Sequence, residues 1–256
     1  MTNNHQIPIA LITGGSRGLG RSMAIKLAEK GNDVIVTYHS NKAEADKVVA
    51  QIEQLGRRAV ALQLDAGNTK SFGNFARQLS ETLAQQWQRE RFDYLVNNAG
   101  TGLHAPFAET TEEQFDDLFN VHFKGVYFLT QRLLPLIADG GRIVNISSGL
   151  ARFSMPGASA YASMKGAVEV FTRYLAKELG PRGIAVNVVA PGAIETDFNG
   201  GRVRDNADLN KMVATNTALG RAGLPEDIGG LVAALLSPDG RWVNGQRIEA
   251  SGGMLL

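Results

Sequence analysis

The sequence predicts an α/β protein in which helices cover both faces of a doubly wound, seven-stranded parallel sheet. Short, apolar, β-branched runs alternate along the chain with longer segments whose apolar residues recur at helical spacing. Residues of unusual chemistry also follow these runs directly, at the strand ends where parallel sheets bind ligands. These residues are Gly14, Asp65, Asn97, Ser148 and Pro191.

The individual elements follow from these patterns. The first strand is expected at 7–13, an almost continuous apolar run that is typical of a strand buried on both faces. A helix is expected over 14–30, and Gly31 stands where that helix would end. The same alternation predicts strands at 33–38, 59–64, 94–96, 142–146, 184–189 and 247–250, and helices at 45–55, 69–88 and 112–137, with a further helix carrying Tyr161.

Composition limits the possible partners and compartments. A chain of 256 residues fits one α/β domain, and its 26 basic and 25 acidic residues nearly cancel, so neither nucleic acid nor an anionic membrane is an expected partner. The absence of cysteine excludes disulfides and thiol catalysis, and no metal site is predicted. Neither a signal peptide nor a membrane-spanning run is apparent. We therefore expect a cytoplasmic protein that acts on a small molecule.

Tyr161 and Lys165 are the strongest candidates for catalysis. They lie four positions apart in a helical segment, so their side chains would share one face of the helix. A nearby ammonium stabilises a phenolate and makes a tyrosine hydroxyl a better acid or base. Ser148 would then hold a substrate oxygen. The pair alone also fits an ordinary exposed helix face, so it must be interpreted together with the glycine loop near the start of the chain.

That loop, TGGSRGLG, places Gly14, Gly18 and Gly20 between the first strand and the first helix. Glycines there permit a tight turn and a close approach of the backbone to a pyrophosphate at the helix N-terminus. An ordinary strand-to-helix turn is the alternative for such a loop taken alone.

The residues after the second strand favour NADP over NAD. That strand ends at Tyr38 without the carboxylate that would bind the ribose 2′-hydroxyl of NAD. Arg17 in the glycine loop and the donors at 39–42 suit a 2′-phosphate instead. For Lys42 alone, a solvated position in the first turn of a helix is the simpler interpretation.

Five ordered motifs together resemble the short-chain dehydrogenase/reductase family, close to its 3-oxoacyl-[acyl-carrier-protein] reductase branch. They are the glycine loop, NNAG at 97–100, Ser148, the Tyr161 and Lys165 pair, and PGAIETD from Pro191. The resemblance covers essentially the whole chain. It implies one NAD(P)-binding Rossmann domain over 1–256 with a substrate lid at about 197–219, and a homotetramer or homodimer.

The resemblance also implies an NADP-dependent oxidoreductase that interconverts a carbonyl and an alcohol by hydride transfer. Tyr161 would exchange the proton, Lys165 would hold the nicotinamide ribose and lower the pKa of Tyr161, and Ser148 would bind the reacting oxygen. A non-catalytic NADP-binding regulator is the alternative. The implied cofactor-binding residues are Gly14, Ser16, Arg17, Gly18, Leu19, Gly20, Tyr38, His39, Ser40, Asn41, Asp65, Ala66, Asn97, Ala99, Gly100, Tyr161, Lys165, Pro191, Gly192, Ile194 and Thr196.

One position departs from the family pattern. Aligning Lys124 and Gly125 places His122 where the family has an asparagine that anchors a proton relay. A neutral imidazole both donates and accepts hydrogen bonds, so His122 could sustain the relay, and a pKa near 6.5 would add pH dependence. A packed histidine without a catalytic role is the alternative. Asn120 would face elsewhere on the helix.

The sequence does not name the substrate. Phe153, Met155 and Phe198 are expected to form an apolar wall, and 199–201 to supply the hinge of a closing lid. The nearby arginines either attract an acidic substrate or are simply solvated; they are Arg152, Arg202 and Arg204. The apolar tail at 254–256 is expected either to fray or to be buried against another subunit.

Overall fold

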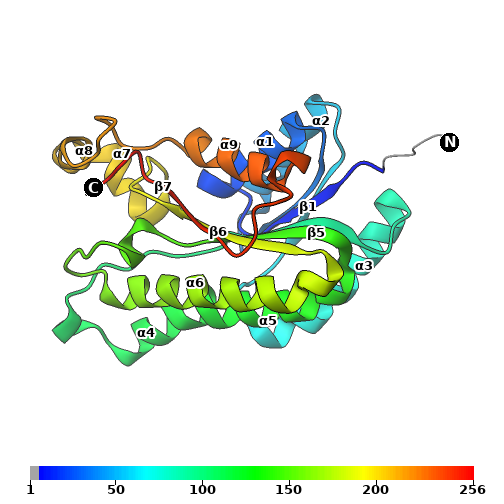
Figure 1. Cartoon of the computed structure of the whole chain (residues 1–256), viewed down its shortest axis with the longest axis horizontal. Coiled ribbons are helices and arrows are strands. Elements are labelled where there is room, and N and C mark those ends of the chain that lie inside the picture. Colours follow the sequence, from blue (N-terminus) through cyan, green and yellow to red (C-terminus); the bar gives the residue numbers. More distant parts are fainter. Residues whose placement is uncertain (1–5) are drawn as a thin grey trace.

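A parallel sheet of seven strands forms the centre of the computed structural model, which describes residues 6–256 (Figure 1). The strand order β3-β2-β1-β4-β5-β6-β7 confirms the predicted doubly wound sheet. Neighbouring strands pair in parallel throughout these residues. The strands are β1 (Ile9–Ile12), β2 (Asp33–Tyr38), β3 (Ala59–Gln63), β4 (Phe92–Asn97), β5 (Ile137–Ile146), β6 (Ala185–Pro191) and β7 (Arg247–Ala250).

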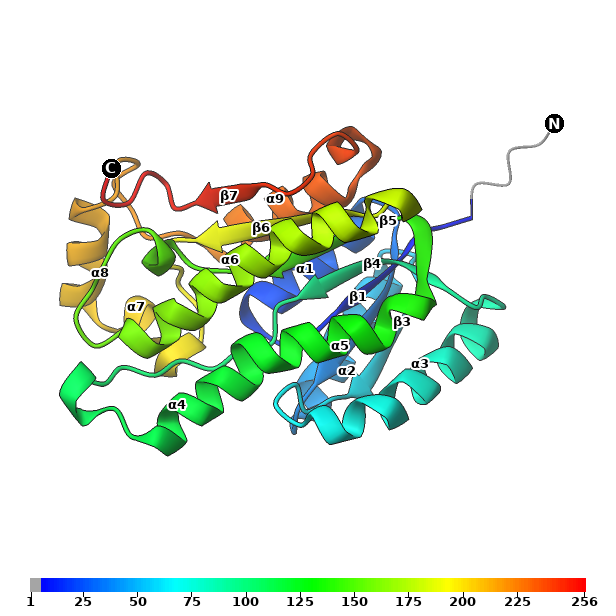
Figure 2. The ribbon, with the colours of Figure 1, turned by 60° about the horizontal axis from the view of Figure 1, so that its bottom comes forward.

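Helices cover both faces of the sheet, as Figures 1 and 2 show. One face carries α1 (Gly18–Glu29), α2 (Lys42–Gln54) and α9 (Pro225–Leu236). The other carries α3 (Phe72–Trp87), α5 (Gly125–Leu133) and α6 (Ser159–Leu179), with α4 (Glu112–Phe119) leading into α5. Within residues 6–256, no helix has the combined length and apolarity needed to cross a membrane.

The central strand β1 shows why the sheet strands appear in the sequence as unbroken apolar runs. Ala10 and Ile12 pack in the core under α1, α2 and α9, whereas Ile9 and Leu11 pack in the core on the opposite face. All four side chains are fully buried. Because successive strand residues point to opposite faces, a strand covered on both sides needs an apolar residue at every position.

The helix predicted over 112–137 is divided and ends earlier. A π-helical stretch, Asn120–Lys124, separates α4 from α5, and a 3₁₀ turn, Leu134–Leu136, follows α5. Pro135 lacks the N–H that would continue the α-helix, and Ile137 instead pairs with Phe92 as the start of β5. The π-helical stretch carries His122, so this irregularity lies at a candidate site residue.

The segment expected as a lid follows β6. It contains α7 (Arg202–Asp205) and α8 (Ala207–Thr215), which Figures 1 and 2 both place beside the C-terminal end of the chain. Leu255 N–H donates to the Asn216 carbonyl at 2.9 Å. Met254 is buried within its own chain, whereas Leu256 is almost fully exposed. The tail is therefore packed against the lid up to its last residues, which corrects the expectation of fraying or of burial only against another subunit.

Candidate active site

The fold brings Ser148, Tyr161, Lys165 and His122 together at the carboxyl end of the sheet. Ser148 follows β5 directly, Tyr161 and Lys165 come from α6, and His122 comes from the π-helical stretch. The His122 and Tyr161 rings meet edge to face with centroids 5.0 Å apart. Lys165 Nζ lies 5.5 Å from the centroid of the Tyr161 ring. The sequence spacing therefore corresponds to a real cluster.

Tyr161 is held in its protonated form. Burial raises the pKa of its hydroxyl, and a hydrogen bond with Ser148 opposes that rise only in part. Ser148 Oγ also accepts a hydrogen bond from Leu150 N–H at 3.2 Å, which caps the 3₁₀ turn Gly149–Ala151. A protonated phenol beside a fixed hydroxyl is suited to giving a proton to a substrate oxygen.

Lys165 is a buried cation with a backbone partner. Its ammonium donates to the Ile146 carbonyl at 2.8 Å, and burial lowers its pKa to about 7. The expected lowering of the Tyr161 pKa by Lys165 is not found, because burial raises that pKa and only the Ser148 hydrogen bond lowers it. The Ile146 carbonyl uses one ammonium hydrogen, so the other two can bind ligand hydroxyls.

His122 does not titrate near neutrality, which corrects the expected pH dependence. Only 1% of the residue is exposed, and burial together with the Lys165 charge lowers its pKa to about 3. Nε2 lies 2.7 Å from the Thr101 carbonyl and 3.2 Å from the Thr101 N–H; because the shorter contact is to an acceptor, we assign the proton of the neutral ring to Nε2. Nδ1 is then a buried acceptor that has no partner among the described residues.

Gly100, the last residue of NNAG, makes room for this imidazole. A Cβ at Gly100 would lie 2.6 Å from His122 Cε1, closer than packed atoms allow. The His122 ring therefore fits against this loop only because Gly100 has no side chain. The sequence alone does not predict this contact, because 22 positions separate His122 from Gly100.

The glycine loop packs directly onto NNAG. A Cβ at Gly14, whose φ is +64°, would lie 2.9 Å from Ala99 Cα. Asn98, which the sequence-based list omits, fixes this arrangement. Its Nδ2 donates to the carbonyls of Thr13 at 2.9 Å and Gly14 at 3.1 Å, and its N–H donates to Thr13 Oγ1 at 2.9 Å. The position of Asn98 directly after a predicted strand is the sequence feature that could have identified it as a site residue.

Asn97 faces the interior, which corrects its inclusion among the expected cofactor-binding residues. Its Nδ2 donates to Thr130 Oγ1 at 3.0 Å and to Asn145 Oδ1 at 2.8 Å, and Asn145 in turn donates to Thr172 Oγ1 at 2.9 Å. All four residues are buried. The Asn97 side chain therefore joins β4 and β5 to the helices below them and is not available to a cofactor.

The residues expected around a 2′-phosphate divide into two groups. Arg17, His39 and Ser40 are exposed at the ends of the neighbouring strands β1 and β2. Asn41 instead caps α2, where its Oδ1 accepts from Glu44 N–H at 3.2 Å. Lys42 pairs with Asp46 at 2.7 Å, so the interpretation as a solvated helix residue fits.

The other expected cofactor residues lie around the same crevice. Asp65 follows β3, accepts from Gly67 N–H at 2.9 Å and lies 3.8 Å from His39. Thr196 Oγ1 accepts from Phe198 N–H at 3.1 Å, and its side chain faces Gly18 across the crevice. The remaining residues lie in the glycine loop, the first turn of α1, the last positions of β2 and β6 and the segments after β3 and β6; they are Ser16, Leu19, Tyr38, Pro191, Ala66, Gly192 and Ile194.

A dinucleotide fits the residues of this crevice. The glycine loop is closed to side chains, because a Cβ at Gly20 would overlap the Gly14 carbonyl and lie 2.7 Å from Asn98 Nδ2. Such a bare backbone at the start of α1 is a pyrophosphate cradle. Lys165 and the unpartnered Nδ1 of His122 supply a donor and an acceptor further along the crevice.

The substrate side is more apolar. A cavity of about 400 Å³ opens between the loops after β4 and β5, and its lining includes Leu150, Met155 and Phe107. Phe198 lies over the site, with its ring centroid 6.0 Å from that of Tyr161. Phe153, expected beside Met155 and Phe198 in one wall, instead packs against Gly149.

The expected hinge has the required backbone. Asn199, Gly200 and Gly201 all adopt positive φ, at 55°, 72° and 74°. Three consecutive left-handed residues give the lid a bend that few sequences tolerate. Arg204 nearby forms ion pairs with Asp197 and Asp205, so its charge is already balanced.

Comparisons with known proteins agree on one family. Residues 14–255 match the family model described as Enoyl-(Acyl carrier protein) reductase. An uncharacterized oxidoreductase of Methylorubrum extorquens is 41% identical over 246 residues, which cover 96% of this chain and 97% of that one. Hydroxynaphthalene reductase arp2 of Aspergillus fumigatus is 36% identical over 250 residues, with 93% and 89% covered.

Solved structures give the same result. The reductase LugOII, described as catalysing keto-reduction at C1 during lugdunomycin biosynthesis, superposes with a TM-score of 0.92 at 41% identity, covering 97% of this chain and 98% of its own. The angucycline C-6 ketoreductase LanV with bound NADP has a TM-score of 0.92 at 36% identity, with 97% and 95% covered.

The doubly wound sheet, the glycine cradle and the cluster of serine, tyrosine and lysine define a dinucleotide-dependent oxidoreductase fold. The chain belongs to the short-chain dehydrogenase/reductase family and is an oxidoreductase of that family.

The buried His122 predicts a measurable pH dependence of stability. Its pKa is about 3 in the folded chain and about 6.5 when unfolded, so unfolding takes up a proton between these values. Stability contributed by the neutral ring is present above pH 6.5 and is lost as the pH falls. Relative to His122→Asn, the free energy of unfolding of the wild type should fall by about 1.4 kcal/mol per pH unit between pH 6 and 4.

Denaturant titrations at several pH values measure this difference. His104→Asn, a substitution at an exposed histidine, serves as the control and should follow the wild type. Parallel stability curves for the wild type and His122→Asn would contradict the assignment.

Proposed function

We propose that the protein interconverts a ketone and a secondary alcohol with NADP, using Tyr161 as the proton donor and acceptor. The observation that carries this proposal is the buried, protonated Tyr161 hydroxyl bonded to Ser148, with Lys165 next to it on the same helix. When bound, NADPH supplies the hydride that reaches the carbonyl carbon.

The residues of the chain then divide the remaining work. Tyr161 gives its proton to the carbonyl oxygen, and Ser148 donates a hydrogen bond to that oxygen as charge develops on it. Lys165, with a pKa near 7, exchanges protons readily at neutral pH and can help to reprotonate the tyrosine. We assign His122 the part of a neutral acceptor in this relay, through the unpartnered Nδ1.

The choice of NADP rests on Arg17, His39 and Ser40 at the ends of β1 and β2, where no carboxylate stands in their place. Two related structures were solved with this cofactor: LanV with NADP, and a blue fluorescent protein from a metagenomic library with NADPH. The latter is 36% identical to this chain.

For the substrate we propose a ketone on a fused ring system. The cavity between the loops after β4 and β5, which reaches Ala162 next to Tyr161, and the ring of Phe198 near that of Tyr161 suit a flat, apolar molecule. Named relatives act on such molecules: one is a hydroxynaphthalene reductase, and LanV was also solved with rabelomycin. A 3-oxoacyl thioester is the second candidate, supported by the family model that the chain matches.

The alternative of a non-catalytic NADP-binding regulator is not supported. The Methylorubrum and Aspergillus relatives, LugOII and LanV are named as oxidoreductases or reductases, and a regulator has no use for a buried proton donor. A cytoplasmic location stays a prediction from the sequence.

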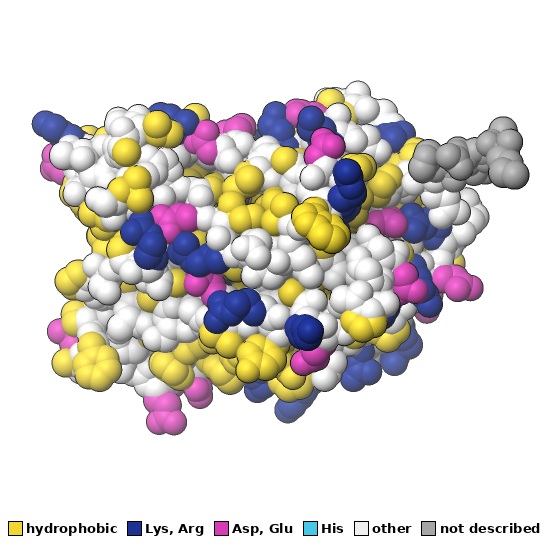
Figure 3. All heavy atoms as spheres, in the orientation of Figure 1, with side chains coloured by type: hydrophobic (Ala, Val, Ile, Leu, Met, Phe, Trp, Pro, Cys, Tyr) yellow, Lys and Arg dark blue, Asp and Glu magenta, His cyan; other side chains and the backbone are white. Residues whose placement is uncertain are grey.

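We propose in addition that the protein is a homo-oligomer. Exposed apolar side chains gather on α4, α5 and α6, where Figure 3 shows hydrophobic groups along the lower edge. They are Phe115, Tyr127, Phe128, Val170 and Tyr174. An apolar area of this kind favours contact with a second copy of the same face.

Replacing Tyr161 by Phe tests the mechanism. The variant should lose at least about a hundredfold in kcat/KM, because general acid catalysis contributes that much or more, while its affinity for NADPH stays the same. Rates of NADPH oxidation are measured with 2-tetralone, quinones, diketones, keto sugars and 3-oxoacyl thioesters. Tyr174→Phe, on the exposed side of the same helix, is the control. Equal rates for wild type and Tyr161→Phe would refute the mechanism.

Replacing Arg17 by Ala tests the cofactor assignment. Loss of a guanidinium at a 2′-phosphate should weaken NADPH binding at least about tenfold, or 1.4 kcal/mol, and leave NADH binding nearly unchanged. Titration of cofactor fluorescence measures both constants. Arg21→Ala, one turn further along α1 and also exposed, should bind both cofactors like the wild type. An equal loss for NADPH and NADH in Arg17→Ala would show that Arg17 does not bind a 2′-phosphate.

Sedimentation tests the oligomer. The purified protein should sediment above the 27.5 kDa of one chain, and the double change Phe128→Glu and Tyr174→Glu should shift it toward that mass, because charges buried in a contact are costly. Leu55→Glu, at an exposed site at the end of α2, should leave the mass unchanged. A monomeric wild type would contradict the proposal.

A further inference from the structure

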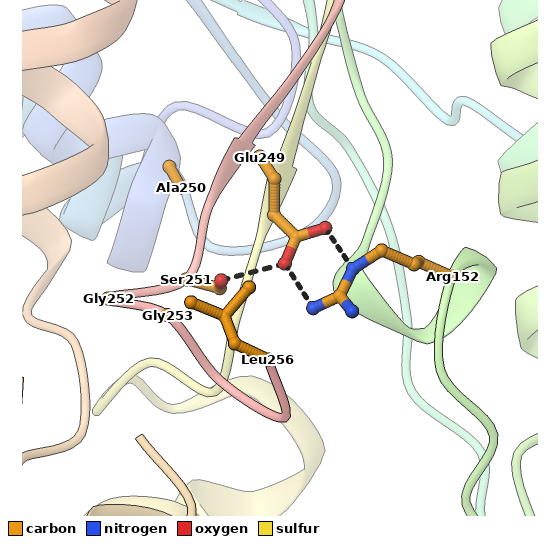
Figure 4. Close-up of a pocket in the computed structure, with 7 residues that line it drawn as sticks. All are labelled: Arg152, Glu249, Ala250, Ser251, Gly252, Gly253 and Leu256. Atoms are coloured by element: carbon orange, nitrogen blue, oxygen red, sulfur yellow. Dashed lines mark hydrogen bonds and ion pairs between the residues drawn. The ribbon is translucent and has the colours of Figure 1, made fainter. Parts of the chain in front are cut away.

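Arg152 lies directly after the turn that follows the candidate catalytic serine, and its hydrogen bonds are made to β7 and to the C-terminal residues. Its guanidinium forms a two-pronged pair with Glu249 of β7, with both N–O distances 2.7 Å. It also donates to the carbonyl oxygens of Met254 at 2.7 Å and Leu255 at 3.2 Å. Figure 4 shows the guanidinium beside the Glu249 carboxylate, with Ser251 on the other side of that carboxylate. Of the two roles expected for Arg152, attraction of an acidic substrate and simple solvation, neither fits.

Glu249 is the centre of a longer chain of charged groups. It accepts from Ser251 Oγ at 2.8 Å and from Arg247 at 2.9 Å. Arg247 also donates to Glu169 at 2.7 Å, and the same Glu169 oxygen accepts from Ser147 Oγ at 2.7 Å. The Arg152 guanidinium is the main reason that the pKa of Glu249 is lowered to about 2. The carboxylate is therefore charged throughout the neutral range.

This chain connects the active-site elements to one another. Glu169 lies one turn beyond Lys165 on α6, and Ser147 immediately precedes Ser148. Only 18% of the Glu249 side chain and 13% of the Glu169 side chain are exposed, so solvent weakens these pairs less than ordinary surface pairs. Two-pronged pairs between arginine and carboxylate also fix orientation as well as distance.

The tail held by Arg152 is in turn bonded to the end of the lid. Ala218 N–H donates to the Gly253 carbonyl at 3.2 Å, and Leu219 N–H donates to the Gly252 carbonyl at 3.0 Å. The other end of the lid begins with the three left-handed residues 199–201. One end of the lid therefore has a permissive backbone, and the other is bonded to the tail.

We propose that Arg152 and Glu249 are positioning residues for the substrate. Their ion pair holds the tail, residues 251–256, between the loop after Ser148 and the 216–219 end of the lid, and so fixes how Phe198 and the lid lie over Tyr161. The effect on catalysis rests on the proposed function, whereas the effect on the tail and lid does not. Because neither Arg152 nor Glu249 contacts the glycine loop that would hold the pyrophosphate, NADPH binding should be independent of the pair.

Hydrogen exchange of the purified enzyme tests the contact without a substrate. In Arg152→Gln, the amides at 216–219 and 254–256 should exchange at least about tenfold faster than in the wild type, while those of α3 stay unchanged. Arg152→Lys, which still pairs with Glu249, should recover protection to within about threefold. Unchanged exchange in Arg152→Gln would overturn the proposal.

Steady-state kinetics with 2-tetralone, or with the best ketone of the panel above, test the consequence. Arg152→Gln should raise KM about tenfold, keep kcat within about threefold and bind NADPH as the wild type does. Deletion of residues 254–256 should reproduce this change and serves as the test if Arg152→Gln does not fold. A kcat loss with an unchanged KM would show that the pair does not position the substrate.

Arg182→Gln is the matched control. Arg182 also binds one carboxylate and two backbone carbonyls, those of Asp139, Leu134 and Ile137, but it does so at the opposite end of the sheet. Its variant should show neither the exchange change nor the KM change. Equal effects in Arg152→Gln and Arg182→Gln would mean that the loss is general destabilisation and would overturn the proposal.

If no ketone is reduced by the wild type, the proposed function fails, and the exchange result still decides whether Arg152 holds the tail and the lid.

Discussion

The hydrogen bonds between the ends of β1 and β4 are the constraint on which the candidate site depends. At this point of the sheet the strand order reverses, so the loops after the two strands diverge and leave a crevice. Thr13 Oγ1 accepts from the N–H groups of both Asn98 and Ala99, and the Asn98 side chain holds the Thr13 and Gly14 carbonyls. The glycine loop is thereby fixed against NNAG, and the start of α1 faces the crevice.

Burial sets the chemistry of the groups around that crevice. It raises the pKa of Tyr161, lowers that of Lys165 to about 7 and lowers that of His122 to about 3. Burial is the largest cause of each shift, since a charge loses hydration when it is taken out of water. A neutral His122 also avoids repulsion with the Lys165 ammonium. An imidazole in this place can therefore act as a hydrogen-bond acceptor without competing for protons at neutral pH.

Ion pairs in this protein contribute differently to stability, depending on how exposed they are to solvent. Lys42 and Asp46 lie one turn apart on the exposed face of α2, where such pairs contribute little. The pairs from Arg152 through Glu249 and Arg247 to Glu169 are partly shielded, share oxygens and join three separate segments of the chain. Because these pairs contact Ser147 and the tail, we propose that they help to fix the geometry of the substrate site.

The sequence by itself determined the seven strands, the helices α1, α2, α3 and α6, the glycine loop and the positions of Ser148, Tyr161 and Lys165, because each depends on spacing between near neighbours. Only the tertiary structure decided that Asn97 points inward while Asn98 holds the glycine loop, although the two residues are adjacent and identical. It also decided the pKa of His122 and the partner of Arg152, which lies 97 positions away. Burial and ion pairing depend on groups that are distant in sequence, so patterns among neighbouring residues cannot predict them.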